Sequence, residues 1–254
     1  MRTSRSPRKQ APRQLTLDSA RKPTGHGGWR PGAGRPRGRK TVSHDARERF
    51  AARHPLHVTL RIKSGVQSLR RGKVCATIRA ALTAGGHKPT FRVVEFNALH
   101  DHLHLLVEAD GPQALARGMQ GLQVRLARRI NRLLERTGSL FATRYHARPL
   151  RTPREVRNAL RYVLLNARHH AAERGRQLAR DWIDPFSSAP WFDGFHADPR
   201  APLGPRGPAC APPDWLAFLQ RQARPTATAR TWLQATGWRR HGLLLPTEVP
   251  GSPT

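Results

Sequence analysis

Acidic residues are scarce in this sequence. Its 254 residues include 46 Lys and Arg but only 16 Asp and Glu, a formal net charge of +30 before the 13 histidines are counted. A chain this basic repels itself unless a polyanion neutralises it, so nucleic acid or an anionic membrane is the expected partner. The codons of a GC-rich genome explain why only six of the basic residues are Lys, but they do not explain the shortage of acids.

Long apolar runs and cysteines are also missing. No run approaches the ~20 residues needed to span a bilayer, and the N-terminal MRTSRSPRKQ leads into no hydrophobic region of a signal peptide. We therefore expect a cytoplasmic protein without a membrane partner. The two cysteines, Cys75 and Cys210, cannot build a disulfide framework or a zinc ribbon. Charge alone does not distinguish DNA from RNA.

Residues 1–53 contain almost no large apolar side chains. They carry 15 Lys and Arg against three acids, and such a segment buries too little surface to fold, so it is predicted to be a disordered basic arm. Within it, Gly-Arg-Pro-Arg-Gly-Arg is similar to an AT-hook, in which Arg35, Arg37 and Arg39 would enter the narrow minor groove of AT-rich DNA. A solvated basic tail that binds any polyanion explains these residues equally well.

Residues 54–172 have the periodicity of a folded α+β core. Alternating apolar residues predict strands, and apolar residues spaced by threes and fours predict helices. The order β-α-β-β-α-β is that of the ferredoxin-like fold, an antiparallel sheet with helices packed on it. The predicted strands are 54–62, 91–96, 102–108 and 140–150, and the helices between them are 74–84 and 112–136. A further helix, 152–170, is predicted to follow this unit.

The last of these helices has a clear start and a clear apolar side. Thr152, Pro153 and Glu155 stand at the N-cap, N1 and N3 positions of a capping box. Its predicted buried stripe is Val156, Leu160, Val163, Leu164 and Ala167.

Residues 173–254 are rich in Pro, Gly and Trp and have poor periodicity, which predicts an irregular C-terminal extension with short helices near 215–219 and 232–238. Its aromatic side chains are either base-stacking platforms or small satellite cores, and we expect satellite cores.

His102, Leu103 and His104 form the first candidate site. Residues i and i+2 of a strand project from the same face, so the two imidazoles would lie side by side. Such a pair can hold a divalent metal ion. The alternative is two half-exposed histidines without a ligand, because 13 histidines produce such pairs by chance.

Tyr162 is the second candidate. It lies one helical turn before Asn166, and Asn158 and His169 extend this polar face beside the apolar stripe. The other tyrosine, Tyr145, lies in a predicted strand and is the weaker candidate.

A series of arginines is the third candidate. Few acids interleave with them, so a track for the phosphate backbone is favoured over a merely solvated face. The residues predicted to bind DNA are Arg125, Arg128 and Arg132, at helical spacing, followed by Arg144 and Arg148.

Two segments carry a family resemblance. Asp-His-Leu-His-Leu-Leu-Val-Glu at 101–108 resembles the His-hydrophobic-His motif of HUH endonucleases, and Leu-Arg-Tyr-Val-Leu-Leu-Asn at 160–166 resembles their single-tyrosine motif. With Arg-Tyr-His-Ala-Arg at 144–148, the combination resembles the REP-associated tyrosine transposases. One departure is visible, because many members have Asn where this sequence has Asp101.

This resemblance implies a DNA-binding transposase that cleaves and rejoins single-stranded DNA near hairpins. It implies that His102, His104 and Asn166 hold Mg²⁺ or Mn²⁺ and that Tyr162 attacks the scissile phosphate, forming a 5′-phosphotyrosine. It also implies a bacterial, nucleoid-associated enzyme that is a monomer or homodimer, with the tyrosine acting in its own or its partner's site.

Two alternatives remain at this point. A domesticated protein would bind hairpin or AT-rich DNA without cutting it. A hydrolytic metal nuclease would use water, and Tyr162 would then be dispensable.

Overall fold

A computed structural model describes residues 48–179, 182–196 and 215–250 of the chain. The basic arm with Arg35, Arg37 and Arg39 lies outside these residues. No helix in the described part is long and apolar enough to cross a membrane.

Five strands form one antiparallel sheet in the order β2-β3-β4-β1-β5. With the short β2 set aside, β1 lies between β4 and β5, which is the strand order of the ferredoxin-like fold and confirms the predicted class. The strands are β1 (Leu56–Arg61), β2 (His87–Lys88), β3 (Phe91–Ala98), β4 (His102–Ala109) and β5 (His146–Pro149).

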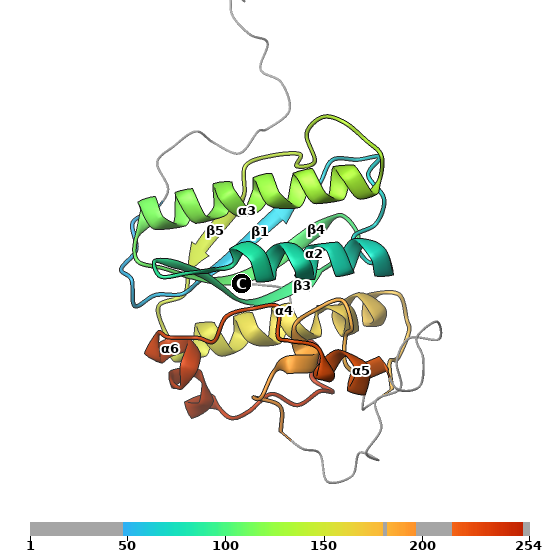
Figure 1. Ribbon diagram of the computed structural model, residues 1–254. Helices are drawn as coiled ribbons and strands as arrows, with labels where there is room; N and C mark the ends of the chain where they lie inside the picture. Colours follow the sequence, from blue (N-terminus) through green and yellow to red (C-terminus); the bar gives the residue numbers. More distant parts are fainter. Residues whose placement is uncertain (1–47, 180–181, 197–214, 251–254) are drawn as a thin grey trace, which may run out of the picture. The chain divides into compact units, whose positions relative to one another are not determined.

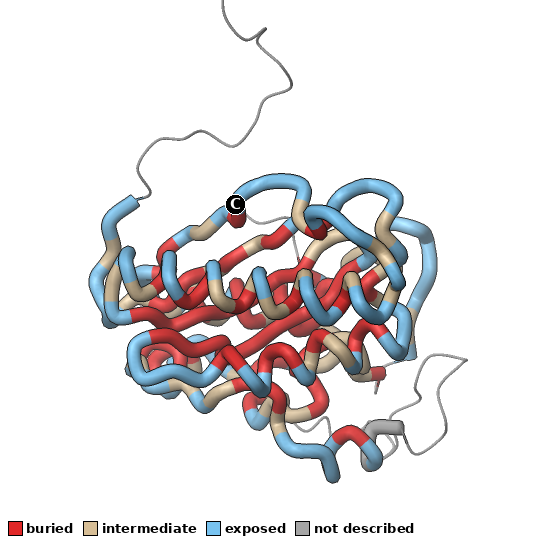
Figure 2. Tube along the Cα trace, turned by 45° about the horizontal axis from the view of Figure 1, so that its top comes forward, coloured by how far each residue is buried: buried red, intermediate tan, exposed pale blue. Residues whose placement is uncertain are grey.

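Three long helices cover the two faces of this sheet: α2 (Gly72–Gly85) and α3 (Pro112–Leu133) on one side and α4 (Pro153–Glu173) on the other (Figure 1). The side covered by α2 and α3, here the core face, receives Leu56, Val58 and Leu60 of β1 and the odd-numbered residues of β4. The side covered by α4, here the polar face, receives the intervening residues. Figure 2 shows the resulting band of buried strands between exposed helix surfaces.

Helix α4 begins as its sequence predicts. The Thr152 hydroxyl accepts from the Glu155 amide at 3.2 Å, and the Glu155 carboxylate accepts from the Thr152 amide at 3.0 Å, which completes the capping box. The buried stripe is also confirmed except at Ala167, which is half-buried because it borders a cavity.

The strand predicted at 140–150 is shorter than expected. Residue 141 makes only an isolated bridge to Ile62, and the chain then bends before β5 begins at His146. The bend turns Tyr145 into the hydrophobic core, where it is 6% exposed. Periodicity does not reveal such a bend, because apolar residues alternate on both sides of it.

The C-terminal segment packs against the same layer as α4. Its helical elements are η1 (Ala189–Trp191), α5 (Trp215–Arg221), α6 (Trp232–Ala235) and η2 (Gly237–His241). Trp238 is buried among α4 residues, as a satellite core requires, and Trp182 is also buried. Phe218 and Trp232 are at least half exposed.

Candidate active site

The histidine pair and the helical tyrosine meet on the polar face. The ring centroids of His102 and His104 lie 4.7 Å apart, so the two imidazoles do project together from β4. The Tyr162 ring, on α4, lies with its centroid 5.1 Å from that of His104 and meets it edge to face. Two segments separated by almost sixty residues are thereby brought into one site.

His102 is oriented by its neighbour Asp101. The Nδ1 atom of His102 lies 2.7 Å from the Asp101 carboxylate, and this hydrogen bond is the main reason that the pKa of Asp101 is lowered. An ionised carboxylate only accepts, so Nδ1 carries the hydrogen, and in the neutral imidazole Nε2 then has the free lone pair. Carboxylate–histidine pairs of this kind orient metal ligands. The residue that departs from the family pattern therefore supports the histidine beside it.

His104 is buried and held from one side only. Its Nδ1 atom lies 3.0 Å from Nε2 of His57 and 3.2 Å from the Thr59 hydroxyl. Its Nε2 atom is buried and has no hydrogen-bond partner in the described part of the chain. Burial lowers the pKa of His104 to about 2, with further lowering by His57 and His102. A neutral imidazole with an unpartnered nitrogen is the state in which histidine binds a metal.

His57 also belongs to this site, although no motif in the sequence marks it. Its ring centroid lies 5.0 Å from that of His104 and 5.7 Å from that of Tyr162. Burial, His146 and Arg148 lower the pKa of His57 to about 4. The signal was present in the alternation of β1, because Leu56 and Val58 face the core and His57 must face the other way. What was missing was the pairing of β1 with β4.

Two asparagines lie between the sheet and α4. Asn166 is fully buried, and neither atom of its amide has a hydrogen-bond partner among the residues described. Asn97 pairs with His104 across β3 and β4 and donates to the Val163 carbonyl at 2.6 Å, which ties the sheet to α4. Buried amide groups are costly when unpartnered, so the Asn166 amide is suited to receive a ligand.

The donor set fits a hard divalent cation that also accepts nitrogen. No group of three His, Cys, Asp or Glu within the described ranges could hold a metal ion. The buried amide of Asn166, one turn after Tyr162 on α4, carries an oxygen of the kind that such a cation accepts.

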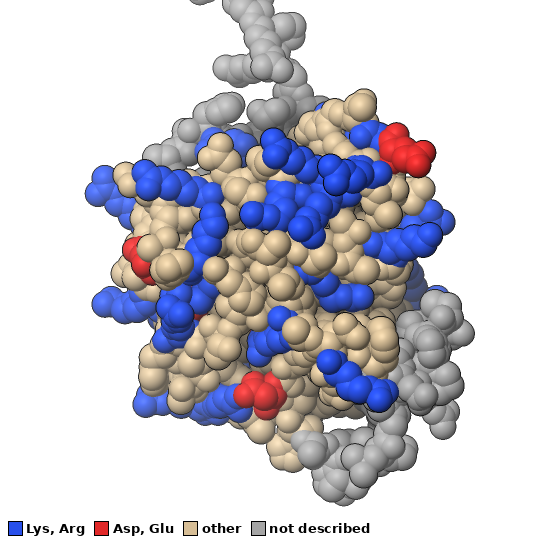
Figure 3. Space-filling view, viewed as in Figure 1, with Lys and Arg blue, Asp and Glu red and all other residues tan. Residues whose placement is uncertain are grey.

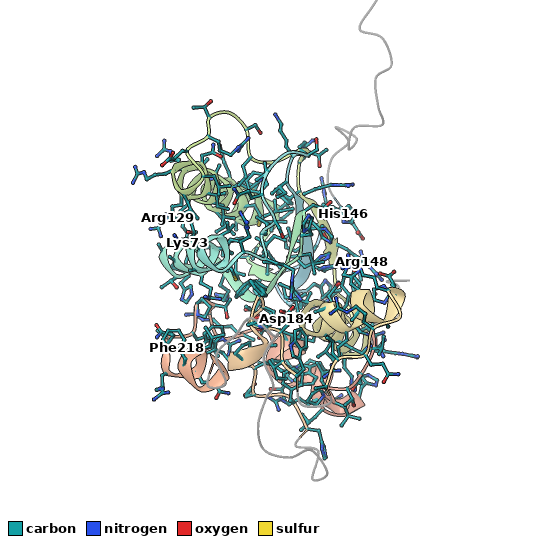
Figure 4. The ribbon with its side chains drawn as sticks, turned by 90° about the vertical axis from the view of Figure 1, so that its right-hand side faces the viewer. Lys73, Arg129, His146, Arg148, Asp184 and Phe218 are labelled. Carbon is teal, nitrogen blue, oxygen red and sulfur yellow. The ribbon has the colours of Figure 1, made fainter. Side chains whose placement is uncertain are left out.

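The structure divides the predicted arginine track between the two sides of the sheet. Arg148 lies opposite His57 in the pairing of β1 and β5, and Arg144 is exposed just before β5. Arg128 and Arg132 are exposed on α3, over the core face, while the Arg125 guanidinium lies partly buried against Gly85. Figure 4 shows this division, with Lys73 and Arg129 on one side and His146 and Arg148 on the other. Helices α2 and α3 contain no acid, and Figure 3 shows basic side chains spread over that surface.

One family model and two solved structures are similar to parts of this chain. None of the curated proteins compared with this chain matches it. Among solved structures, a REP-associated tyrosine transposase bound to a REP hairpin is similar at 15% identity and a TM-score of 0.44, covering 58% of this chain and 82% of its own. A crystal structure described as that of "a putative transposase from Deinococcus radiodurans R1" is similar at 18% identity and a TM-score of 0.33, covering 56% of this chain and 98% of its own.

The family model described as "Transposase IS200 like" matches residues 51–164. This range contains β1 to β5, the histidine pair and Tyr162. These residues, somewhat less than half of the chain, are therefore similar to the IS200-like transposase family.

Proposed function

We propose that this chain is a single-tyrosine transposase that cleaves and rejoins single-stranded DNA beside hairpins. The observation that carries the proposal is the approach of the Tyr162 ring to the His104 imidazole, at 5.1 Å between centroids. The match of residues 51–164 to a transposase family model supports DNA as the substrate, and the REP hairpin bound to a similar protein suggests the form of that DNA.

In the proposed reaction Tyr162 is the nucleophile. Its phenolic oxygen loses its proton and forms a bond to phosphorus, while the bond from phosphorus to the 3′ oxygen breaks. The products are a 5′-phosphotyrosine and a strand with a free 3′-OH, which takes up a proton. Because the covalent intermediate keeps the energy of the phosphodiester, a 3′-OH can reverse the step at a new junction without ATP.

His102, His104 and Asn166 are proposed to hold Mg²⁺ or Mn²⁺. When bound, such an ion polarises the scissile phosphate and offsets its negative charge. The remaining work falls to this chain's own groups. Asp101 and His57 would hold the two imidazoles in the tautomer that donates from Nδ1 and leaves Nε2 for the cation. Burial keeps His104 neutral, so that it does not repel a cation.

The arginines are proposed to contact DNA at two places. Arg148, which lies opposite His57 in the sheet, and Arg144, four residues earlier, would hold the strand that is cleaved. Arg125, Arg128 and Arg132 lie over the core face and would contact a more distant part of the DNA backbone. Arg35, Arg37 and Arg39 are proposed to reach an AT-rich minor groove. We also propose that the chain consists of a basic arm at 1–53, a transposase domain at 54–172 and an extension at 173–254. Its proposed location is the bacterial nucleoid.

The decisive experiment compares the natural protein with Tyr162→Phe. Both are incubated with Mn²⁺ and labelled single-stranded hairpin oligonucleotides, including the repeats that flank the gene, and resolved on denaturing gels. We expect a covalent protein–DNA adduct from the natural protein and none from Tyr162→Phe. Cleavage that survives the substitution would indicate a hydrolytic nuclease. Tight binding without cleavage by either protein, with the metal site occupied, would indicate a domesticated DNA-binding protein.

A further inference from the structure

A cavity of about 350 Å³ lies beside His102, between the turn that joins β3 to β4 and the second half of α4. We propose that it binds one nucleotide of the DNA strand, next to the phosphate that is cleaved. This inference rests on the proposed function for the identity of the strand. The cavity's volume is within the range of about 300–1,000 Å³ that is common for sites of small ligands.

One buried arginine, Arg168, and one half-buried arginine, Arg70, hold the walls of this cavity in place. The Arg168 guanidinium donates to the carbonyls of Leu178 at 3.2 Å and Trp182 at 3.1 Å, which folds the chain after α4 back along the helix. Arg70 forms two 2.9 Å hydrogen bonds to Asp184 and one of 3.2 Å to the Ala98 carbonyl. The cavity is therefore formed by fixed contacts, although three separate segments line it.

The lining suits a base and a phosphate. Leu99 and Trp182 are buried and give it apolar walls, and the small side chain of Ala171 leaves the space open. Arg174 and Arg176 also line it; both are exposed and neither forms an ion pair within the described ranges. An apolar hollow with cations at its margin is the arrangement by which proteins hold single-stranded nucleotides, the base in the hollow and the backbone on the cations.

The position of the cavity assigns it a role in the reaction. His102 both lines the cavity and belongs to the histidine pair. A nucleotide whose base occupies the cavity would place an adjoining phosphate beside that pair. Fixing a reacting group in this way removes much of the entropic barrier to reaction. An unpaired nucleotide enters such a pocket at low cost, which favours single-stranded DNA over duplex.

The test fills the cavity from α4. Ala171→Leu places a larger side chain in it, and Ala172→Leu is the matched control, since Ala172 is exposed on the same helix and is not part of the lining. Both are made in the Tyr162→Phe background, which cannot cleave. Binding is measured by fluorescence anisotropy with the hairpin repeats that flank the gene, each carrying one abasic nucleotide at a different position near the junction of hairpin and single strand.

We expect one abasic position to weaken binding about fivefold or more when the cavity is intact. In Ala171→Leu the abasic nucleotide should cause no further decrease in affinity, because the intact oligonucleotide already binds weakly to the filled cavity. In Ala172→Leu the decrease caused by the abasic nucleotide should remain. Arg176 is exposed, so Arg176→Ala should not disturb folding. This substitution should lower the affinity for the oligonucleotide and reduce the salt dependence of binding by the amount expected for about one phosphate contact.

The proposal is overturned if no abasic position matters, or if Ala171→Leu keeps the full abasic profile. Unchanged affinity and salt dependence in Arg176→Ala would overturn the assigned phosphate contact. Failure of the proposed function has a different signature. The natural protein would then form no adduct, while one abasic nucleotide would still weaken binding and Ala171→Leu would still remove that effect. Such a result would support the nucleotide site and contradict the transesterification.

Discussion

The two faces of one sheet serve different purposes in this molecule. On the core face, β4 contributes Leu103, Leu105 and Val107, all buried against α2 and α3. On the polar face the same strand contributes His104 and Glu108, which are equally buried. A strand that alternates apolar and polar residues normally has one side in water. Here both sides are covered, so the polar side chains are inside the protein.

Buried polar groups cost free energy unless they have partners, and the polar face supplies partners for some and not for others. Glu108 accepts from the Arg92 side chain and from the Arg230 and Thr231 amides, so it is well satisfied and anchors the C-terminal segment. His104 and Asn166 each keep a buried atom without one. His104 and Asn166 leave such atoms where a ligand is expected, and Glu95 and Gln234 leave others elsewhere on this side of the sheet.

The largest effects should come from two neighbours in β4. Leu105→Ala should lower the free energy of unfolding by about 2–5 kcal/mol, because it empties a fully buried position of the hydrophobic core. His104→Ala should abolish adduct formation at a smaller cost in stability, because it removes an unsatisfied buried nitrogen together with the imidazole. Urea unfolding and the hairpin cleavage assay measure the two quantities. A His104→Ala protein that still forms the adduct would contradict the division of roles between the faces.

The next effect depends on pH and concerns Glu95, a buried residue of the polar face. Burial raises the pKa of Glu95 to about 7, although Arg224 donates to it at 2.6 Å. Between the ordinary value of 4.5 and about 7, the folded protein binds more protons at this residue than the unfolded chain does. Its contribution to stability is therefore fully present below about pH 4.5 and is lost as the pH rises to about 7. The loss should reach at most about 3 kcal/mol.

Glu95→Gln isolates this contribution, because the amide cannot ionise. Urea unfolding of both proteins from pH 4.5 to 8 should show the natural protein losing stability relative to Glu95→Gln as the pH rises. A difference that stays constant over this range would mean that Arg224 keeps Glu95 ionised throughout.

Particular residues show how far the sequence reaches. The alternation of Leu56, Val58 and Leu60, the capping box at Thr152 and the spacing of α3 are local patterns, and each is found as predicted. The same holds for the projection of His102 and His104 from one side of β4. Each of these follows from the geometry of a single element.

The rest depends on contacts between distant segments, which no local pattern encodes. The contact of His57 with His104 requires the register of β1 against β4. The separation of Arg148 from Arg128 and Arg132 requires knowing which face of the sheet α3 covers. The cavity beside His102 requires the return of the chain after α4, held by Arg168. Tertiary packing determines all three.

The smallest of these effects should come from His57, which we expect to act as a positioning residue for His104. His57→Gln removes the imidazole that lies 3.0 Å from His104 Nδ1. Loss of such an orienting partner typically lowers metal affinity 10- to 100-fold, equivalent to about 1.4–2.7 kcal/mol. Mn²⁺ binding measured by calorimetry in the Tyr162→Phe background should show this decrease without DNA or cleavage.

A suitable control is His146→Gln, since His146 is exposed in β5 on the same side of the sheet. It should leave Mn²⁺ affinity within about twofold of the starting protein, because it does not contact His104. Equal losses in both variants would mean that charge near the site matters, not the orientation of one imidazole. A His57→Gln protein with undiminished Mn²⁺ affinity would show that Thr59, 3.2 Å from the same nitrogen, is sufficient to hold His104. His57 would then not be required for Mn²⁺ binding, although it lies on the polar face beside His104.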